Sequence, residues 1–154
     1  MKHKAIVCDI DNCLIDISKI DNVVAQGDIT YNEVFAFFEE KANDLDWVVK
    51  TAPLFQLIKF YYESDYEIIL LTARSRRIQE ETYKFLTSGT PKLPKEIIIV
   101  SRGLSEEGIP DDELKKLKLE KILEDYDVEI CIDDKAKNCE MFKKYGIFTL
   151  QVVI

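Results

Sequence analysis

The chain has 154 residues, of which 47% are hydrophobic, and this length and composition predict one domain, 1–154, with a continuous core. The formal net charge of -8 excludes an extended nucleic-acid surface, which needs clustered lysine and arginine, but leaves short nucleic-acid ends and free nucleotides as partners. Because the apolar runs are short, we expect a cytoplasmic protein with no membrane partner; the oligomeric state stays open.

Short apolar runs predict five buried strands. In chain order they are AIVC at 5–8, EIILL at 67–71, EIIIV at 96–100, VEICI at 128–132 and FTLQVVI at 148–154. Segments with helical spacing lie between them, at 53–62, 110–126 and 137–145. Strands that alternate with helices predict an α/β fold with a mostly parallel sheet.

Residues 15–50 are too long for a simple connection from a strand to a helix, and we expect a cap or lid inserted after the first strand. This segment holds an aromatic stripe made of Tyr31, Phe35, Phe37 and Phe38. The stripe favours a cap core, with a base-stacking platform as the alternative.

The four cysteines form no CxxC pair, and two of them lie inside strand-like apolar runs. Small apolar residues belong at such positions, so we expect reduced thiols rather than disulfides or a zinc site. The four residues are Cys8, Cys13, Cys131 and Cys139.

Polar residues follow four of the predicted strands, and the carboxyl ends of parallel strands meet at one edge of a sheet. Each residue alone could cap a helix or begin a loop. Four such strand ends predict a single polar site instead. In chain order the residues are Asp9 and Asp11, Thr72 and Arg74, Ser101 and Arg102, and Asp133 and Asp134.

These motifs resemble the haloacid-dehalogenase (HAD) superfamily of aspartate-nucleophile phosphatases. DIDNCL is similar to the first motif, DxDxT, LLTAR to the second, and ICIDDKAKNCEMF to the fourth. Within the superfamily the chain most resembles the 3′-phosphatase half of phage polynucleotide kinase-phosphatases and their stand-alone phage relatives. The resemblance covers most of 1–152, is weakest in 15–50, and implies a Rossmann-like three-layer α/β/α sandwich.

The resemblance implies a Mg2+ ion that offsets the repulsion between neighbouring carboxylates. Its ligands would be Asp9, the backbone carbonyl of Asp11 and the acidic pair of the fourth motif. Because successive strand residues point in opposite directions, we expect Asp133 as the direct ligand and Asp134 as an indirect contact, unless the strand ends early. The resemblance also makes Asp9 the nucleophile and Asp11 the general acid and base.

The remaining phosphate contacts are also implied by the resemblance. Thr72 would hydrogen-bond the phosphate and Arg74 would bind it bidentately, while Arg102 is either a second phosphate contact or a structural residue. DDELK is similar to the family's Asp-Asp-x-x-Lys run and selects Lys115, oriented by Asp111, as the lysine that neutralises the phosphate. Lys118 is the rival.

Two residues depart from the family pattern, because Asn12 and Cys13 replace the usual Gly-Thr. Asparagine tolerates a left-handed φ, so we expect the turn to be retained, while the thiol alters the fine geometry. Nucleophilic catalysis by Cys13 is disfavoured because the only histidine, His3, precedes the strand.

The leading hypothesis is a Mg2+-dependent phosphomonoesterase that acts on a nucleotide or the 3′ end of a polynucleotide. One alternative keeps the chemistry but acts on a small metabolite such as a sugar phosphate. Another is a catalytically silent protein that holds a phosphorylated ligand, which the complete set of acids disfavours. Because the sequence contains no GxxxxGK[ST] motif, kinase activity is not supported.

Overall fold

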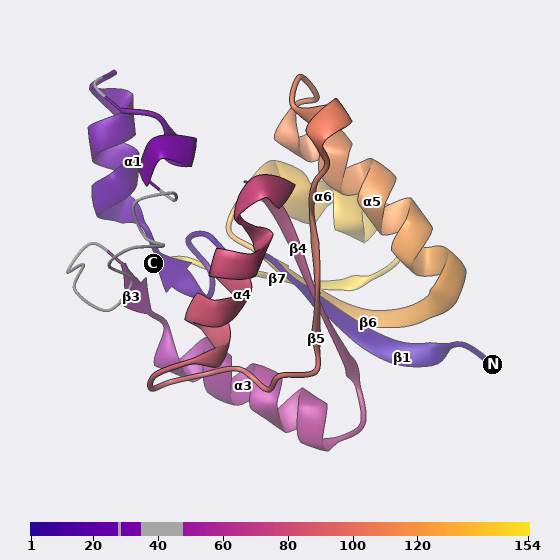
Figure 1. Cartoon of the computed structure of the whole chain (residues 1–154). Helices are drawn as coiled ribbons and strands as arrows, with labels where there is room; N and C mark the ends of the chain where they lie inside the picture. Colours follow the sequence, from indigo (N-terminus) through magenta and orange to yellow (C-terminus); the bar gives the residue numbers. More distant parts are fainter. Residues whose placement is uncertain (28, 35–47) are drawn as a thin grey trace.

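The apolar runs form one five-stranded parallel sheet in the computed structural model, which describes residues 1–27, 29–34 and 48–154 (Figure 1). The strand order is β5-β4-β1-β6-β7, and every neighbouring pair is parallel. The strands are β1 (His3–Cys8), β4 (Glu67–Ser75), β5 (Ile97–Arg102), β6 (Tyr126–Asp133) and β7 (Phe148–Gln151).

Helices cover both faces of the sheet and complete the three layers (Figure 1). They are α3 (Ala52–Glu63) and α4 (Gln79–Thr87) on one face, and α5 (Asp111–Asp125) and α6 (Ala136–Lys144) on the other. Side chains alternate along β1, so Ile6 and Cys8 join the core under α3 and α4, whereas Ala5 and Val7 join the core under α5 and α6. The expected α/β sandwich is therefore confirmed.

The strands are longer than the apolar runs that predict them. β1 begins at the exposed His3, which pairs with Tyr126 of β6, and β4 continues past Leu71 to Ser75 through an irregular register. Hydrophobicity marks only the buried part of a strand, and its polar ends carry no such signal. β7 instead ends at Gln151, before the end of the predicted run.

Part of the segment 15–50 is described. It starts with β2 (Ile15–Asp16) and α1 (Ser18–Ala25), and β2 pairs antiparallel with β3 (Val49–Lys50) at its other end. Lys50 Nζ donates to the carbonyl oxygens of Ser88 and Pro91, at 2.5 and 2.9 Å, which ties the base of the segment to the loop after α4. Three residues of the aromatic stripe, Phe35, Phe37 and Phe38, lie outside the described residues.

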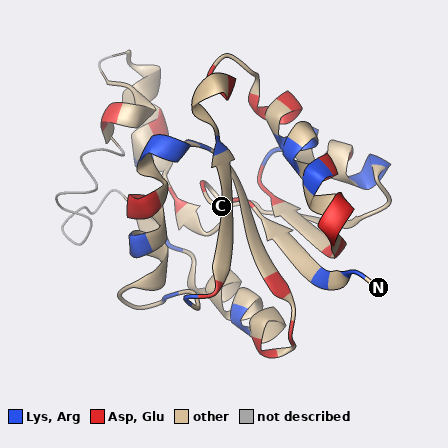
Figure 2. Cartoon of the chain, turned by 45° about the vertical axis from the view of Figure 1, so that its right-hand side comes forward, with Lys and Arg blue, Asp and Glu red and all other residues tan. Residues whose placement is uncertain are grey.

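Most charged side chains of the sheet and its helices lie on the helices and near the strand ends (Figure 2), and Glu129 in the middle of β6 is an exposed exception. Of the helices described here, none has both the length and the apolar content to cross a bilayer. Two short 3-10 helices, η1 (Arg76–Ile78) and η2 (Leu104–Glu106), follow β4 and β5 and carry the chain away from the sheet edge.

Candidate active site

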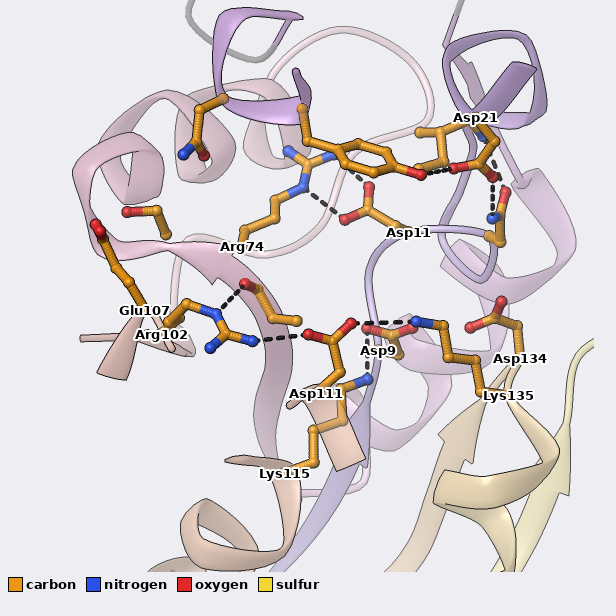
Figure 3. Close-up of a pocket in the computed structure, with 16 residues that line it drawn as sticks. Asp9, Asp11, Asp21, Arg74, Arg102, Glu107, Asp111, Lys115, Asp134 and Lys135 are labelled. Atoms are coloured by element: carbon orange, nitrogen blue, oxygen red, sulfur yellow. Dashed lines mark hydrogen bonds and ion pairs between the residues drawn. The ribbon is translucent and has the colours of Figure 1, made fainter. Parts of the chain in front are cut away.

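A cavity of about 530 Å3 opens at the carboxyl ends of β1 and β4 (Figure 3). The strands, and α5 beside them, contribute Asp9, Asp11, Arg74, Arg102 and Lys115 to its lining, and Asp134 follows β6. The segment 15–50 contributes Ile17, Asp21, Tyr31 and Asn32 from the other side. Each of the four predicted strand ends therefore contributes to the cavity, although Thr72, Ser101 and Asp133 are not among the described residues that line it.

Asp9 is the first residue after β1, and its backbone amide donates to Ile132 at 2.8 Å, so its position is fixed by the neighbouring strand. Lys115 Nζ lies 3.0 Å from Asp9 Oδ1 and 2.6 Å from Asp133 Oδ2, and the lysine side chain is only 3% exposed. Burial raises the pKa of Asp9 well above its usual value; Lys115 opposes this rise, and the charges of Asp133 and Asp11 add to it.

The pKa of Lys115 also lies above its usual value. Burial by itself lowers it, but the negative charges of Asp9 and Asp133 outweigh that effect, so the ammonium group stays charged. A permanent positive charge beside the carboxylate of Asp9 is what the binding of a phosphoryl group requires. Lys118, the rival for this place, instead pairs with Glu106 at 2.7 Å.

Of the acidic pair at the end of β6, Asp134 and not Asp133 lines the cavity. Asp133 is buried, and both of its oxygens are engaged, by Lys115, by the backbone amide of Lys135 at 3.0 Å and by the Asn138 amide at 3.2 Å. Asp134 lines the cavity instead. β6 ends at Asp133, whose side chain is buried against Lys115, and the first residue beyond the strand is the one that lines the cavity.

The described carboxylates fit a hard divalent cation. Ligand atoms of Asp9, Asp134 and Cys13 lie within 4.8 Å of one another. Asp134 Oδ1 is buried and accepts no hydrogen bond from the described part of the chain, and burial is also the main cause that raises the pKa of Asp134. Mg2+ prefers such oxygen ligands, and a dication would compensate the charge that burial destabilises.

Asp11 is paired with Arg74. The guanidinium donates from Nε to Oδ2 at 2.8 Å and from Nη2 to Oδ1 at 2.5 Å, while Nη1 donates to Thr82 at 3.2 Å. Both partners are largely buried, with side-chain exposures of 7% for Arg74 and 22% for Asp11. The expected contact of Arg74 with a phosphate therefore competes with this ion pair.

The turn after Asp11 keeps the expected left-handed residue, because Asn12 has φ 58°. Its side chain accepts from the Ile17 amide at 3.2 Å and donates to Asp21 at 2.9 Å, two bonds that glycine could not make. Cys13 is buried with its Sγ 4.0 Å from Asp9 Oδ2, and burial raises the pKa of its thiol, which disfavours a thiolate nucleophile. All four cysteines are free thiols.

Thr72 and Arg102 have structural partners. Thr72 is buried, accepts from the Arg74 amide at 3.1 Å and is not among the described residues that line the cavity, so its phosphate contact remains a prediction. Arg102 donates to the carbonyl oxygens of Ala73, Glu106 and Ile109 and, at 2.7 Å, to Asp111. These bonds favour a structural role for Arg102 over a second contact with the phosphate.

The expected contact between Asp111 and Lys115 is wrong. Asp111 accepts from Arg102 at 2.7 Å and from Lys135 at 3.2 Å, whereas Lys115 turns inward to Asp9 and Asp133. Both residues lie on one face of α5, but the buried carboxylates attract the lysine more strongly than an exposed neighbour does.

Three residues that the sequence reasoning missed support the site. Asn138 holds Asp133, Lys135 lines the cavity beside Asp134, and Asp21 bonds to Asn12. Asn138 is one turn into α6, and a polar residue predicted on the buried face of a helix is the signal that could have found it. No comparable signal marks Asp21, which lies on a helix of the inserted segment.

Comparison with known proteins places the chain in a phosphatase family. The model of the family described as the polynucleotide kinase PNKP phosphatase domain matches residues 3–153. A comparison with curated proteins finds no significant match.

Several solved structures have a similar fold. A chain of the Pnkp1/Rnl/Hen1 RNA repair complex is 24% identical with a TM-score of 0.72, and the match covers 98% of this chain but 42% of that one. The class C acid phosphatase of Bacillus anthracis with tungstate bound is 18% identical, with a TM-score of 0.65 and coverages of 97% and 67%. A HAD family enzyme of Bacteroides thetaiotaomicron, in complex with magnesium and inorganic phosphate, is 18% identical, with a TM-score of 0.57 and coverages of 97% and 93%.

Proposed function

The chain belongs to the family of polynucleotide kinase PNKP phosphatase domains, within the HAD phosphatases, and on this premise we propose a Mg2+-dependent enzyme that removes phosphate from a nucleotide or from the 3′ end of a polynucleotide. Hydrolysis of a phosphoric monoester follows from the family; the metal and the substrate are our proposal. We also infer that 1–154 form one phosphatase domain with 15–50 as its cap. The match covers only 42% of the similar chain in the Pnkp1/Rnl/Hen1 complex, so that protein's partners are not assigned to this one.

One observation carries the proposal: the buried carboxylate of Asp9 lies between a fixed ammonium group and a second carboxylate in one cavity. Lys115 Nζ lies 3.0 Å from Asp9 Oδ1, and a carboxylate oxygen of Asp134 lies within 4.8 Å of one of Asp9. We assign Mg2+ to Asp9 and Asp134, with the backbone carbonyl of Asp11 as a further ligand. Bound there, the ion would neutralise charge on the transferring phosphoryl group.

In the first half of the reaction, an oxygen of Asp9 attacks phosphorus and the bond from phosphorus to the leaving oxygen breaks, giving an aspartyl-phosphate. Asp11 supplies the proton that the departing alkoxide needs. Both oxygens of Asp11 accept from Arg74 in this structure, so Arg74 must release Asp11 first. A phosphate dianion is the natural competitor for the guanidinium, because it offers the same bidentate geometry.

In the second half, Asp11 takes a proton from water, the water oxygen attacks phosphorus, and the bond to Asp9 breaks. Inorganic phosphate leaves and the free Asp9 carboxylate is restored. Lys115 keeps its place beside Asp9 in both halves, since its charge stabilises the phosphoryl oxygens in each transition state.

Positive charge at one edge of the cavity supports a nucleotide or a nucleic-acid end over a simple sugar phosphate. Arg74 lines the cavity, and the 3-10 helix that follows its strand carries Arg76 and Arg77. Arg77 is exposed and pairs with Glu107 at 3.4 Å, a screened contact that another anion could replace. A second phosphate group, such as the next one along an oligonucleotide, would use this edge, whereas a single phosphate on a small sugar would make little use of it.

A substrate panel tests the proposal. The protein is assayed with 3′-phosphorylated oligonucleotides, 3′- and 5′-nucleotides and sugar phosphates, each with Mg2+ and with EDTA. We expect Mg2+-dependent release of phosphate, with the highest kcat/KM for nucleotides or 3′-phosphorylated ends. Equal efficiency toward sugar phosphates would favour the small-metabolite alternative, and activity that survives EDTA would contradict the metal site.

A further inference from the structure

Tyr31 belongs to the inserted segment, yet it lines the same cavity as Asp9 and Asp11. It is 40% exposed, although a large aromatic side chain usually gains stability by being buried. The sequence favoured the aromatic stripe as cap core, but at this position the ring faces the cavity. An aromatic surface beside the phosphate site is a feature that the hydrolysis of a bare phosphate group does not require.

The position of the ring is fixed at its hydroxyl end. The Tyr31 hydroxyl donates to Asp21 Oδ1, and the other oxygen of Asp21 accepts from the Asn12 amide at 2.9 Å. Figure 3 shows Asp21 with a hydrogen bond on each side. One carboxylate therefore joins Tyr31 to the turn that directly follows the general acid.

The bond of Tyr31 to Asp21 requires that the phenol keep its proton. Burial, the hydrogen bond to Asp21 and the charges of Asp21 and Asp11 raise the pKa of Tyr31 to about 12, so the phenol keeps its proton and remains a donor at neutral pH. A ring held in advance loses less conformational entropy when a ligand packs on it. With the hydroxyl committed to Asp21, contact with a ligand would come from the ring.

We propose that Tyr31 determines specificity, its ring packing against the base of the nucleotide that carries the phosphate, and that Asp21 and Asn12 are the positioning residues that hold it. This inference rests on the proposed function. Stacking accepts any base, because every base has a π-face, so Tyr31 would distinguish a nucleotide from a bare sugar phosphate without selecting a sequence.

The test compares two oligonucleotides that differ only at the 3′-phosphorylated residue, which carries a base in one and is abasic in the other. We expect the wild type to prefer the first in kcat/KM, on the order of 10-fold. Tyr31→Ala should bring this ratio close to one, with the change mostly in KM. Tyr31→Leu keeps apolar volume without a π-face and should do the same, which guards against a variant that fails to fold.

Tyr145 provides a matched control. It is 37% exposed and its hydroxyl bonds to a carboxylate, that of Glu120, at 3.0 Å, but it does not line the cavity. Tyr145→Ala should leave the ratio at the wild-type value. Asn12→Gly removes the amide that holds Asp21 while accepting the left-handed φ, so it should reduce the ratio part of the way, as should Tyr31→Phe, which keeps the ring but loses the bond to Asp21.

Each outcome has a distinct meaning. A wild-type ratio near one, or a Tyr31→Ala loss that is equal for both oligonucleotides, would overturn the role of Tyr31 and leave the proposed function standing. A wild type that hydrolyses sugar phosphates but neither oligonucleotide would overturn the proposed function and the inference with it. A ratio that falls close to one in Tyr31→Ala and Tyr31→Leu, and keeps its wild-type value in Tyr145→Ala, would support the role of Tyr31.

Discussion

Arg74 engages both carboxylate oxygens of Asp11, at 2.8 and 2.5 Å, across the mouth of the cavity. Arg74 lies on β4 and Asp11 on the loop after β1, and the two residues are 63 positions apart in the chain. As the general acid that we propose, Asp11 would be blocked until another anion binds the guanidinium. Binding of the phosphate and release of the acid would thus be one event.

The first prediction follows from this pair. Arg74→Ala should lower kcat/KM for a 3′-phosphorylated oligonucleotide on the order of 100-fold, because the phosphate loses a bidentate partner. The loss should be smaller for a small generic ester, because such a substrate has no second phosphate group that could also bind at the Arg74 edge of the cavity. Arg74→Lys keeps the charge without the fork of donors and should recover only part of the rate.

Arg77→Ala is the control for this prediction, since Arg77 is exposed and pairs with Glu107 outside the Asp11 pair. It should affect binding of the longer substrate only weakly, and the effect should fade with added salt. An Arg74→Ala loss that is uniform across all substrates would argue against a phosphate contact specific to nucleotides.

The second prediction concerns stability. Lys115→Met should lower the free energy of unfolding by about 3–5 kcal/mol, because it leaves Asp9 and Asp133 as uncompensated buried charges. Lys118→Met is the matched control on the same helix; its pair with Glu106 is partly exposed and should contribute about 1 kcal/mol or less. Urea denaturation measures both. Similar losses for the two variants would contradict the central position of Lys115.

The third prediction concerns the metal. Mg2+ should raise the melting temperature of the wild type, because it binds only the folded carboxylate cluster, by roughly 2–4 °C for each kcal/mol of binding free energy. Asp134→Asn should remove most of this rise. EDTA-treated samples without added Mg2+ provide the baseline melting temperature. A rise of equal size in Asp134→Asn would place the ion elsewhere.

The fourth prediction concerns the turn after Asp11. Asn12→Ala and Asn12→Gly both remove the two side-chain hydrogen bonds, but only alanine resists the φ of 58°. Asn12→Ala should therefore be about 1 kcal/mol less stable than Asn12→Gly in chemical denaturation. Equal stabilities would show that the turn relaxes without cost.

Motif and strand pattern were enough to place Asp9, Asp11 and Arg74 at one edge of a parallel sheet. The polar residues directly follow the apolar runs in the sequence, and a parallel sheet brings the carboxyl ends of its strands together at one edge. Lys115 was chosen because DDELK resembles the family's Asp-Asp-x-x-Lys run, and it lies beside Asp9, although Asp111, which we expected to orient it, bonds to Arg102 and Lys135 instead.

The roles of Asp133 and Asp134 could not be read in the same way. Alternation predicts that the two side chains diverge, but which one reaches the cavity depends on where β6 ends, and a strand end is set by its neighbours. Tyr31 belonged to the expected aromatic stripe, but its bond to Asp21 could not be predicted, because that bond joins two parts of an insertion whose path no local pattern fixes.

The central claim is that Asp9 is the nucleophile, and trapping the phosphorylated protein tests it most directly. Wild-type protein is mixed with Mg2+ and a 3′-phosphorylated oligonucleotide, quenched in acid within the first turnover, and digested for mass spectrometry. We predict one added phosphoryl group on the peptide that contains Asp9, and none in a folded Asp9→Asn variant, whose turnover should fall by several orders of magnitude. Near-normal turnover in Asp9→Asn, or a phosphoryl group on another residue, would contradict the account.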